Sequence, residues 1–203
     1  MRSIKLPIRF KFDLDKLIAS ISFFADNKLE DLSKLKVCKL LYYADKYHLV
    51  KPGRPIIGDV YVHLDNGPVP SNSLNIMNEV IAADKIYLKS GDVSNEEKFG
   101  EYLSVKKPIF SRHPIFYLKK QHNFDCLSES ELEALKRTME HYGRKSPSAL
   151  IDLTHEEVAW KNSSCNTEID YRLFFEEEPE ADPRAREYME AMQENVEVML
   201  GLE

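Results

Sequence analysis

The chain has 203 residues, of which 43% are hydrophobic and 31% are charged, a composition typical of globular proteins. This length suffices for one large domain, or for one domain with an appendage. No apolar run approaches the roughly 20 residues that span a membrane, and the first residues lack the apolar core of a secretory signal. Three cysteines without a CxxC spacing argue against a disulfide framework and a zinc cluster, so we expect a cytoplasmic protein.

The net charge of −6 is unevenly distributed along the chain. Residues 1–51 contain 11 Lys and Arg against 6 Asp and Glu, whereas residues 150–203 contain 4 against 15. A general nucleic-acid-binding protein presents a broad basic surface, so the acidic end argues against that class. A locally basic N-terminal face stays open, although charge runs are usually solvated faces.

Two helices and a strand are predicted for the first third of the chain. Apolar residues recur at helical spacing in residues 12–27 and in residues 32–49, and Pro52 stops the second helix. The Val- and Tyr-rich run 58–64 predicts a strand. Residues 65–70 then turn the chain and keep it extended.

The middle of the chain has the weakest pattern. A helix is expected over residues 71–83, where a serine can cap its start. Beyond it, short apolar runs predict strands over 86–89, 102–110 and 115–119, with a polar loop over 90–97.

Clear start signals predict the helices of the C-terminal half. A capping box at residues 128–131 begins a helix that ends at residue 142. A proline at the first helical position begins a short helix over residues 146–153. A second capping box, at residues 154–157, predicts another turn of helix that reaches Trp160. This only tryptophan is expected to anchor the core.

The last segment differs in character from the rest. Residues 176–183 are acidic and broken by proline, which predicts a linker, and a helix then continues to about residue 200. An apolar stripe runs along this helix: Tyr188, Met189, Met192, Val196 and Met199. Methionine adapts to irregular surfaces, so the stripe either packs back on its own domain or docks on a partner or a second copy.

These elements predict a mainly α fold with a small β component, in the α+β class. We expect one helix-rich domain with short strands over residues 1–175. An acidic linker and an amphipathic helix follow it over residues 176–203.

The predicted helix over residues 32–49 carries polar side chains beside a wide apolar arc. Lys36, Lys39 and Lys46 gather on the narrow remainder, which we expect to be its solvent-facing edge. Asp45 and His48 lie within the apolar arc, three residues apart on one face. Since buried polar groups need partners, this pair indicates an internal polar network, a functional centre with a tuned histidine, or a histidine at the solvent edge.

Motifs that carry chemistry are sparse. The chain has no GxGxxG, P-loop, HExxH or GxSxG motif, and its six histidines show no metal-ligand spacing. His63 and Asp65 share a strand face, which suits a metal or a base but more often marks a solvent-facing edge. Nothing combines into a nucleophile, a base and an oxyanion hole. We therefore expect neither an enzyme nor a bound metal or cofactor.

Five runs of sequence together resemble a known family. KLLYYADKYHL, GRPIIGDVY, GPVPS, SESELEAL and HYGRKSPSALIDLTHEEVAW follow the order and spacing of the Panacea domain, the SocA-type antitoxin of bacterial and phage toxin–antitoxin systems. The resemblance covers about residues 12–161. It implies a role in phage defence and a cognate protein toxin as partner, neutralised by direct binding. In one branch of the family the antitoxin delivers its toxin to an AAA+ protease.

The residues that match the family pattern are candidates for structural or partner-binding roles. The resemblance marks Tyr42, Asp45, His48, Arg54, Pro55, Gly58, Asp59, Tyr61, Gly67, Pro68, Val69, His155 and Trp160. Among them, Asp45, His48, Arg54 and Asp59 are expected to form one internal network, because a buried acid needs a cation or a donor. Specificity for a toxin is expected in residues 84–125, which match the family poorly, and on the stripe of the last helix, which lies beyond the match.

Three functions remain open. The first is an antitoxin that binds and occludes a protein toxin. The second is a protease adaptor or a transcriptional regulator on the same domain. The third is an enzyme centred on Asp45, His48 and His155. We expect no membrane partner and no nucleic acid as the main partner, while a homodimer stays open.

Overall fold

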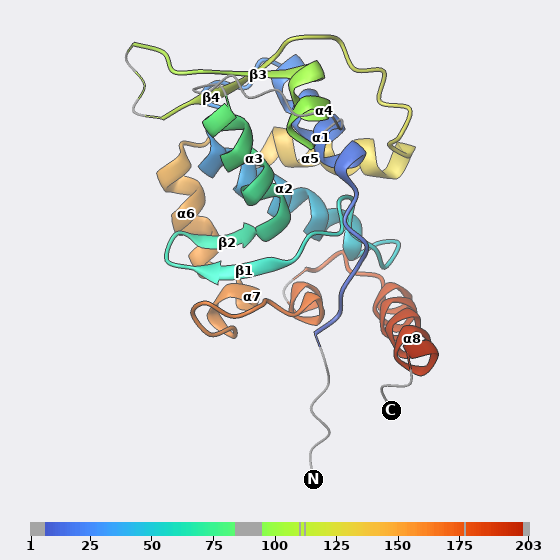
Figure 1. Cartoon of the computed structure of the whole chain (residues 1–203). Helices are drawn as coiled ribbons and strands as arrows, with labels where there is room; N and C mark the ends of the chain where they lie inside the picture. Colours follow the sequence, from blue (N-terminus) through green and yellow to red (C-terminus); the bar gives the residue numbers. More distant parts are fainter. Residues whose placement is uncertain (1–6, 84–94, 110, 112, 177, 201–203) are drawn as a thin grey trace.

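The computed structural model describes residues 7–83, 95–109, 111, 113–176 and 178–200, without the side chains of residues 83, 95–96 and 195–200. Over these residues the chain is helix-rich with two small antiparallel sheets, which confirms the predicted α+β class (Figure 1). The elements are α1 (Leu14–Asp26), α2 (Lys34–Leu49), β1 (Tyr61–Leu64), β2 (Gly67–Pro70), α3 (Ser71–Ala83), α4 (Asn95–Tyr102), β3 (Leu103–Lys106), β4 (Ile115–Leu118), α5 (Glu129–Tyr142), α6 (Pro147–Glu156), α7 (Val158–Lys161), the 3-10 helix η1 (Tyr171–Phe175) and α8 (Pro183–Leu200).

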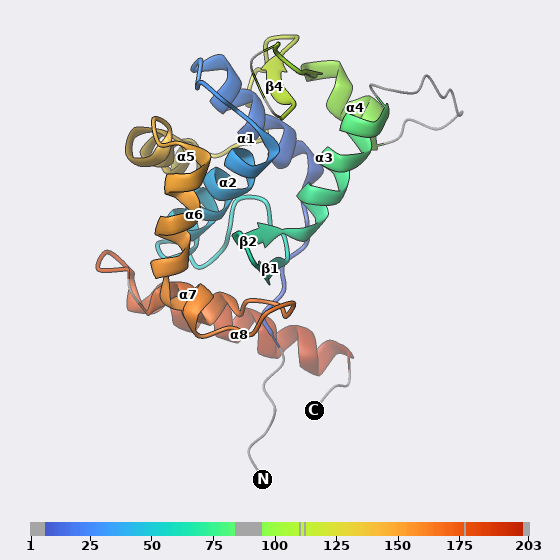
Figure 2. The ribbon, with the colours of Figure 1, turned by 90° about the vertical axis from the view of Figure 1, so that its left-hand side faces the viewer.

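Helix α2 lies at the centre of the fold. It packs against α5 and α6, and also against β2 and α3, so other elements surround it (Figures 1 and 2). Every residue of α2 from Lys36 to Leu49 is buried. This central position explains the wide apolar arc of α2, since a helix surrounded by protein has little need of a polar face.

The β1–β2 hairpin follows α2 and confirms the predicted strand and extended segment. Its strands pair in antiparallel register, with Tyr61 opposite Pro70 and Leu64 opposite Gly67. Residues 166–169 run along the other edge of β1, where the N–H of His63 donates to the carbonyl oxygen of Thr167 at 2.9 Å. The outer edge of β1 is therefore covered, which protects it from pairing with another chain.

The middle of the chain differs from the prediction. The strand expected over residues 86–89 lies outside the described residues. Helix α4 occupies residues where a loop and the start of a strand were expected, and β3 is correspondingly shorter. The reason is tertiary packing, because Phe99 is fully buried and stacks edge-to-face on Phe116 of β4. The pairing of β3 with β4 confirms the remaining strands of this region.

The C-terminal half follows its start signals with one exception. The capping box of Ser128 and Glu131 is formed in both directions and begins α5. The second predicted capping box is wrong, because α6 continues through Thr154, whose hydroxyl donates to the carbonyl oxygen of Ile151. Helix α7 begins after Glu157 with no side-chain cap. The sequence pattern did not predict the 3-10 helix η1.

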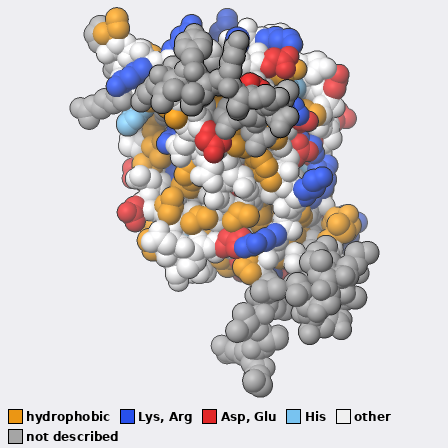
Figure 3. All heavy atoms as spheres, in the orientation of Figure 1, with side chains coloured by type: hydrophobic (Ala, Val, Ile, Leu, Met, Phe, Trp, Pro, Cys, Tyr) orange, Lys and Arg blue, Asp and Glu red, His pale blue; other side chains and the backbone are white. Residues whose placement is uncertain are grey.

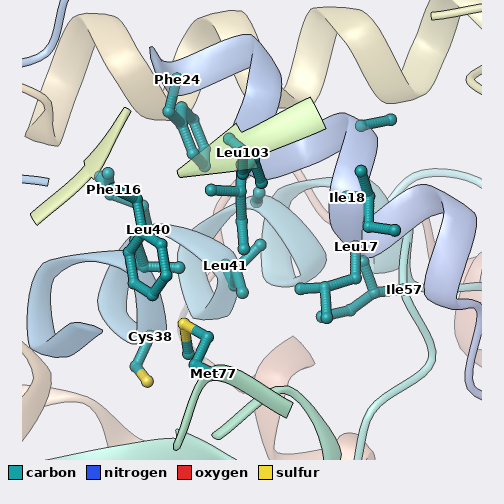
Figure 4. Packing of buried hydrophobic residues seen from close by; sticks show 14 of the residues in the cluster. Leu17, Ile18, Phe24, Cys38, Leu40, Leu41, Ile57, Met77, Leu103 and Phe116 are labelled. Carbon is teal, nitrogen blue, oxygen red and sulfur yellow. The ribbon is translucent and has the colours of Figure 1, made fainter. Parts of the chain in front are cut away.

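Two hydrophobic clusters form the core, and α2 contributes to both. The first joins α1, α2, α3 and the β3–β4 hairpin around side chains such as Leu17, Leu41 and Met77 (Figure 4). The second joins α2, β1, η1 and α8, and it contains Tyr42, Tyr61 and Met189. None of the described helices has the length and the apolar character required to cross a membrane.

Candidate functional site

The carboxylate of Asp45 anchors the chain that follows α2. Its Oδ1 accepts hydrogen bonds from the backbone N–H groups of Ile56 and Ile57 at 2.9 and 3.0 Å. Its Oδ2 accepts from the Tyr61 hydroxyl at 3.0 Å. Asp45 is 1% exposed, and burial raises its pKa to about 7. The side chain therefore holds the crossing between α2 and β1 from the inside.

The carboxylate of Asp59, a residue outside α3, caps the N-terminus of that helix. Its Oδ1 accepts from the backbone N–H of Asn72 at 2.9 Å, and its Oδ2 accepts from the backbone N–H and the hydroxyl of Ser73 at 2.8 and 2.6 Å. A carboxylate suits this place, because the first N–H groups of a helix lack intrahelical partners. The Asp59 carbonyl oxygen accepts from the Tyr171 hydroxyl at 2.6 Å, which ties η1 to the same point.

His48 and Arg54 belong to a separate set of contacts around α5. The Nδ1 atom of His48 lies 2.8 Å from the carbonyl oxygen of Arg54, and its Nε2 lies 3.0 Å from the Ser130 hydroxyl. The Arg54 guanidinium donates to Glu131 at 2.6 Å, and Glu131 also accepts from Lys16 at 2.7 Å. Burial would raise the pKa of Glu131, but these cations and a backbone N–H lower it to about 2.

The prediction of one network through Asp45, His48, Arg54 and Asp59 is therefore wrong. Backbone N–H groups and hydroxyls occupy the two aspartates, while Arg54 pairs with Glu131. His48 is 2% exposed, so it does not lie at the solvent edge. Burial lowers the pKa of His48, which favours the neutral ring, and both ring nitrogens have partners.

The lysines of α2 are buried, so the prediction of a solvent-facing lysine edge is also wrong. Lys36, Lys39 and Lys46 are 3%, 0% and 5% exposed. Lys36 donates to the carbonyl oxygen of Glu30 at 2.8 Å, and Lys46 pairs with Glu157. A hydrophobicity pattern counts lysine as solvated, whereas its long stem can be buried once the amine reaches an acceptor.

Lys39 lies under the turn of the β1–β2 hairpin. Its Nζ donates to the carbonyl oxygen of Pro68 at 2.9 Å, and burial lowers the pKa of this amine to about 8. Gly67 has a φ of +90°, and a Cβ atom there would lie 2.6 Å from the Lys39 Nζ and would clash with Thr154. The motif glycine is therefore explained by the close approach of a buried amine.

Trp160 lies between two histidine rings. It stacks on His63 with ring centroids 4.4 Å apart and on His155 with centroids 4.1 Å apart. The His63 Nδ1 lies 2.8 Å from the Ser163 hydroxyl, and His63 is 9% exposed, so the expected solvent-facing edge is wrong for this residue. Trp160 is half-buried rather than a fully buried anchor, and its Nε1 donates to the carbonyl oxygen of Leu64 at 3.3 Å. The stack joins the hairpin to α6 and α7.

The remaining motif residues also have interior positions. Those that are buried are Tyr42, Pro55, Gly58 and Val69. The Tyr42 ring packs edge-to-face on Tyr61 with centroids 5.5 Å apart. Gly58 has a φ of +65°, and a Cβ atom there would clash with the carbonyl oxygen of Lys11. The motif residues thus mainly shape the interior of the domain.

The predicted docking stripe on α8 is split between a buried and an exposed face. Ala185 and Met189 are 4% and 0% exposed and belong to the second core cluster. Tyr188 and Met192 are 53% and 48% exposed. The side chains of Val196 and Met199 lie outside the described residues.

Gly53 marks the place where α8 meets the rest of the domain. It has a φ of +81°, and a Cβ atom there would lie 2.6 Å from the carbonyl oxygen of Ala185 and 3.0 Å from the Tyr188 ring. The N–H of Asp182 donates to the carbonyl oxygen of Val50 at 2.8 Å. A glycine at this point lets the last helix approach the end of α2 closely.

A pocket of about 400 Å³ lies between the start of α2, the hairpin turn and α3. Hydrophobic side chains gather on this side of the molecule, over α3 and the β1–β2 hairpin (Figure 3). The pocket is lined by Lys34, Leu35, Cys38, Leu64, Asp65, Asn66, Val69, Leu74 and Asn166. Within the described ranges, no group of three or more His, Cys, Asp or Glu residues is arranged to hold a metal ion.

Sequence reasoning missed several residues that build the site. Glu131 was recognised only as part of a capping box, and its contacts with Lys16 and Arg54 join distant parts of the chain. Thr154 was assigned to a cap, although it packs against Gly67. The one available signal was the glycine before Pro68, since a glycine in a tight turn often marks a close approach.

The fold and the site define a helix-rich scaffold whose polar motif residues brace its interior. The family model for the antitoxin SocA-like Panacea domain matches residues 37–161. The match covers more than half of the chain, and the chain belongs to this family, as the sequence motifs predicted. No curated protein and no solved structure matches the chain.

Proposed function

We propose that this protein is the antitoxin of a toxin–antitoxin pair and that it neutralises a cognate protein toxin by direct binding, without catalysing a reaction. Its membership of the SocA-like antitoxin family supports the antitoxin role. The positions of the motif residues support binding as the mechanism.

The interior position of the polar motif residues is the observation that carries this proposal. Asp45, His48 and Asp59 are each at most 2% exposed, and each has hydrogen-bond partners within the domain. A catalytic group needs an open side on which a substrate can approach it. Groups enclosed in this way brace a scaffold, and a scaffold acts on its partner through its surface.

Co-expression of this chain with the protein encoded immediately beside it tests the proposal. The neighbour alone should stop growth, and co-expression should restore growth and yield a complex that purifies intact. A folded His48→Gln variant is the matched control, because glutamine can also hydrogen-bond at this place. It should restore growth to the same extent. A folded variant that forms the complex but no longer restores growth would contradict the binding mechanism and favour an enzyme.

Two other results would also contradict the proposal. Restored growth without a stable complex would argue against occlusion, and dependence of that rescue on an AAA+ protease would favour the adaptor function. If the neighbouring protein does not stop growth when it is expressed alone, it is not a toxin, and this contradicts the proposed toxin–antitoxin pair.

A further inference from the structure

His48 and Ser130 form a hydrogen-bonded pair in which one partner is buried and the other is open to solvent. The Nε2 atom of His48 lies 3.0 Å from the Ser130 hydroxyl. His48 is 2% exposed, whereas Ser130 is exposed and is the second residue of α5. A reagent from solvent can therefore reach the serine without meeting the enclosed histidine.

The hydrogen-bond partners assign the protons of this pair. The carbonyl oxygen of Arg54 lies 2.8 Å from the His48 Nδ1 and can only accept, so Nδ1 carries the hydrogen. Burial lowers the pKa of His48 and favours the neutral ring, which then has a lone pair on Nε2. The Ser130 hydroxyl therefore donates to the histidine, which is the arrangement of a nucleophile and its base.

The Ser130 oxygen keeps a free lone pair, and the space beside it is small. The Ser128 hydroxyl lies 3.1 Å from this oxygen and is the donor in that contact, because the Ser130 proton points to His48. A hydroxyl oxygen has two lone pairs, so one remains for attack. A cavity of about 40 Å³ is lined by Ser130 and His48 together. Pockets for drug-sized ligands have about 300–1,000 Å³, so this space fits only a small group.

The start of α6 repeats this arrangement without the histidine. Ser148 is the second residue of α6 and follows the capping Ser146, just as Ser130 is the second residue of α5. The hydroxyls of Ser146 and Ser148 lie 3.0 Å apart, and Ser148 is exposed. Within the described ranges no histidine forms a hydrogen bond with Ser148. Ser148 therefore separates the effect of His48 from the effect of the position in the helix.

We infer that Ser130 is a nucleophile activated by His48 and that it accepts a small acyl group, such as acetyl, from an activated ester. The Ser130 oxygen forms a bond to the carbonyl carbon of the ester while its proton moves to the His48 Nε2. The bond between this carbon and the leaving oxygen then breaks, and the leaving oxygen takes the proton. The step modifies the protein itself and goes beyond the proposed function, which requires no reaction at this serine.

The test treats the full-length protein with p-nitrophenyl acetate near neutral pH and follows the release of p-nitrophenolate. Ser130→Ala removes the nucleophile, His48→Gln replaces the base by an amide, and Ser148→Ala is the matched control. Peptide mapping by mass spectrometry, after an acid quench at short times, locates the acetyl groups on the unsubstituted protein. Melting temperatures are measured for all variants, because His48 is buried.

We expect the unsubstituted protein to be acetylated at Ser130 at least about 100-fold faster than at Ser148, as assistance by a general base provides. Ser130→Ala and His48→Gln should release p-nitrophenolate more slowly than the unsubstituted protein, while Ser148→Ala should release it at the same rate.

Release by Ser130→Ala at the rate of the unsubstituted protein would overturn the inference, whether or not the acyl group stays on the serine. So would release at that rate by a folded His48→Gln variant, because the histidine would then not act as the base. If His48→Gln does not fold, the comparison of Ser130→Ala with Ser148→Ala decides, since both of those substitutions are at exposed positions.

Discussion

Lys39 Nζ donates a hydrogen bond to the carbonyl oxygen of Pro68 over 2.9 Å, and this contact joins the central helix to the hairpin that follows it. The lysine is fully buried, and its pKa is lowered to about 8 by that burial. Placing an ammonium group in the interior is unfavourable unless its hydrogen bonds compensate for the lost water. The pair therefore makes the stability of the domain depend on pH.

We predict that the stability of the protein, relative to a Lys39→Met variant, rises by about 1 kcal/mol between about pH 7 and pH 9. The pKa of Lys39 is about 8 in the folded chain against 10.5 for an ordinary lysine. Between these values the unfolded chain binds more protons than the folded one, so stability increases with pH. Urea unfolding of both proteins across this range measures the difference.

Methionine is similar in length to lysine but does not titrate. The contributions of other groups that titrate at alkaline pH therefore cancel when the stabilities of the two proteins are compared. Lys46→Met is a second control, because it removes another buried lysine amine of α2, one that pairs with the carboxylate of Glu157. Parallel stability curves for the unsubstituted protein and Lys39→Met would show that Lys39 does not titrate in this range.

Substitution of Gly67 by alanine should destabilise the domain by at least about 2 kcal/mol. The residue has a φ of +90°, and a Cβ atom would lie 2.6 Å from the Lys39 amine. Gly100→Ala is the matched control, since Gly100 lies in α4 and a Cβ atom there meets nothing within 4 Å. That substitution should stabilise the protein by up to about 1 kcal/mol, because alanine favours a helix. Similar melting temperatures for both variants would refute this account of the turn.

Asp45 offers a comparison between losing an acceptor and losing a charge. Asp45→Ala should destabilise by about 2–4 kcal/mol, because the buried N–H groups of Ile56 and Ile57 lose their acceptor. Asp45→Asn retains an amide oxygen at the same place and should cost about 1 kcal/mol. Thermal and urea unfolding of the two variants near neutral pH measures both values.

The raised pKa of Asp45 adds a pH dependence to this prediction. With a pKa of about 7 in the folded chain against 3.8 for an ordinary aspartate, the folded state binds more protons between these values. Stability from this group is therefore gained as the pH falls and lost as it rises through about 7. The difference between the unsubstituted protein and Asp45→Asn should widen towards acid pH. A constant difference would contradict protonation of Asp45.

The helices that could be predicted are those whose signals are local. Ser128 and Glu131 lie three residues apart and form their capping box as expected. The apolar arc of α2 also predicted its burial, because the periodicity of a helix depends only on neighbours in the chain. Helix α4 was missed because its start falls in a polar run, and its burial depends on Phe116, which lies 17 residues after Phe99.

The site could be predicted only as a set of residues, not as a set of contacts. Asp45 and His48 share a helix face, yet Asp45 bonds to residues 56, 57 and 61, whereas His48 faces α5. Sequence spacing gives the face of a helix but not which element covers it. The burial of Lys36, Lys39 and Lys46 has the same origin, because their acceptors come from other segments.

The last prediction separates the two faces of α8. Met189→Ala should destabilise the protein by about 2–4 kcal/mol, because it leaves a cavity in the second core cluster. Met192→Ala should change stability by less than about 0.5 kcal/mol, since that side chain is 48% exposed. Urea unfolding of the two single variants measures this contrast between the same residue type on one helix. Small and equal effects would show that the body of the domain does not hold α8.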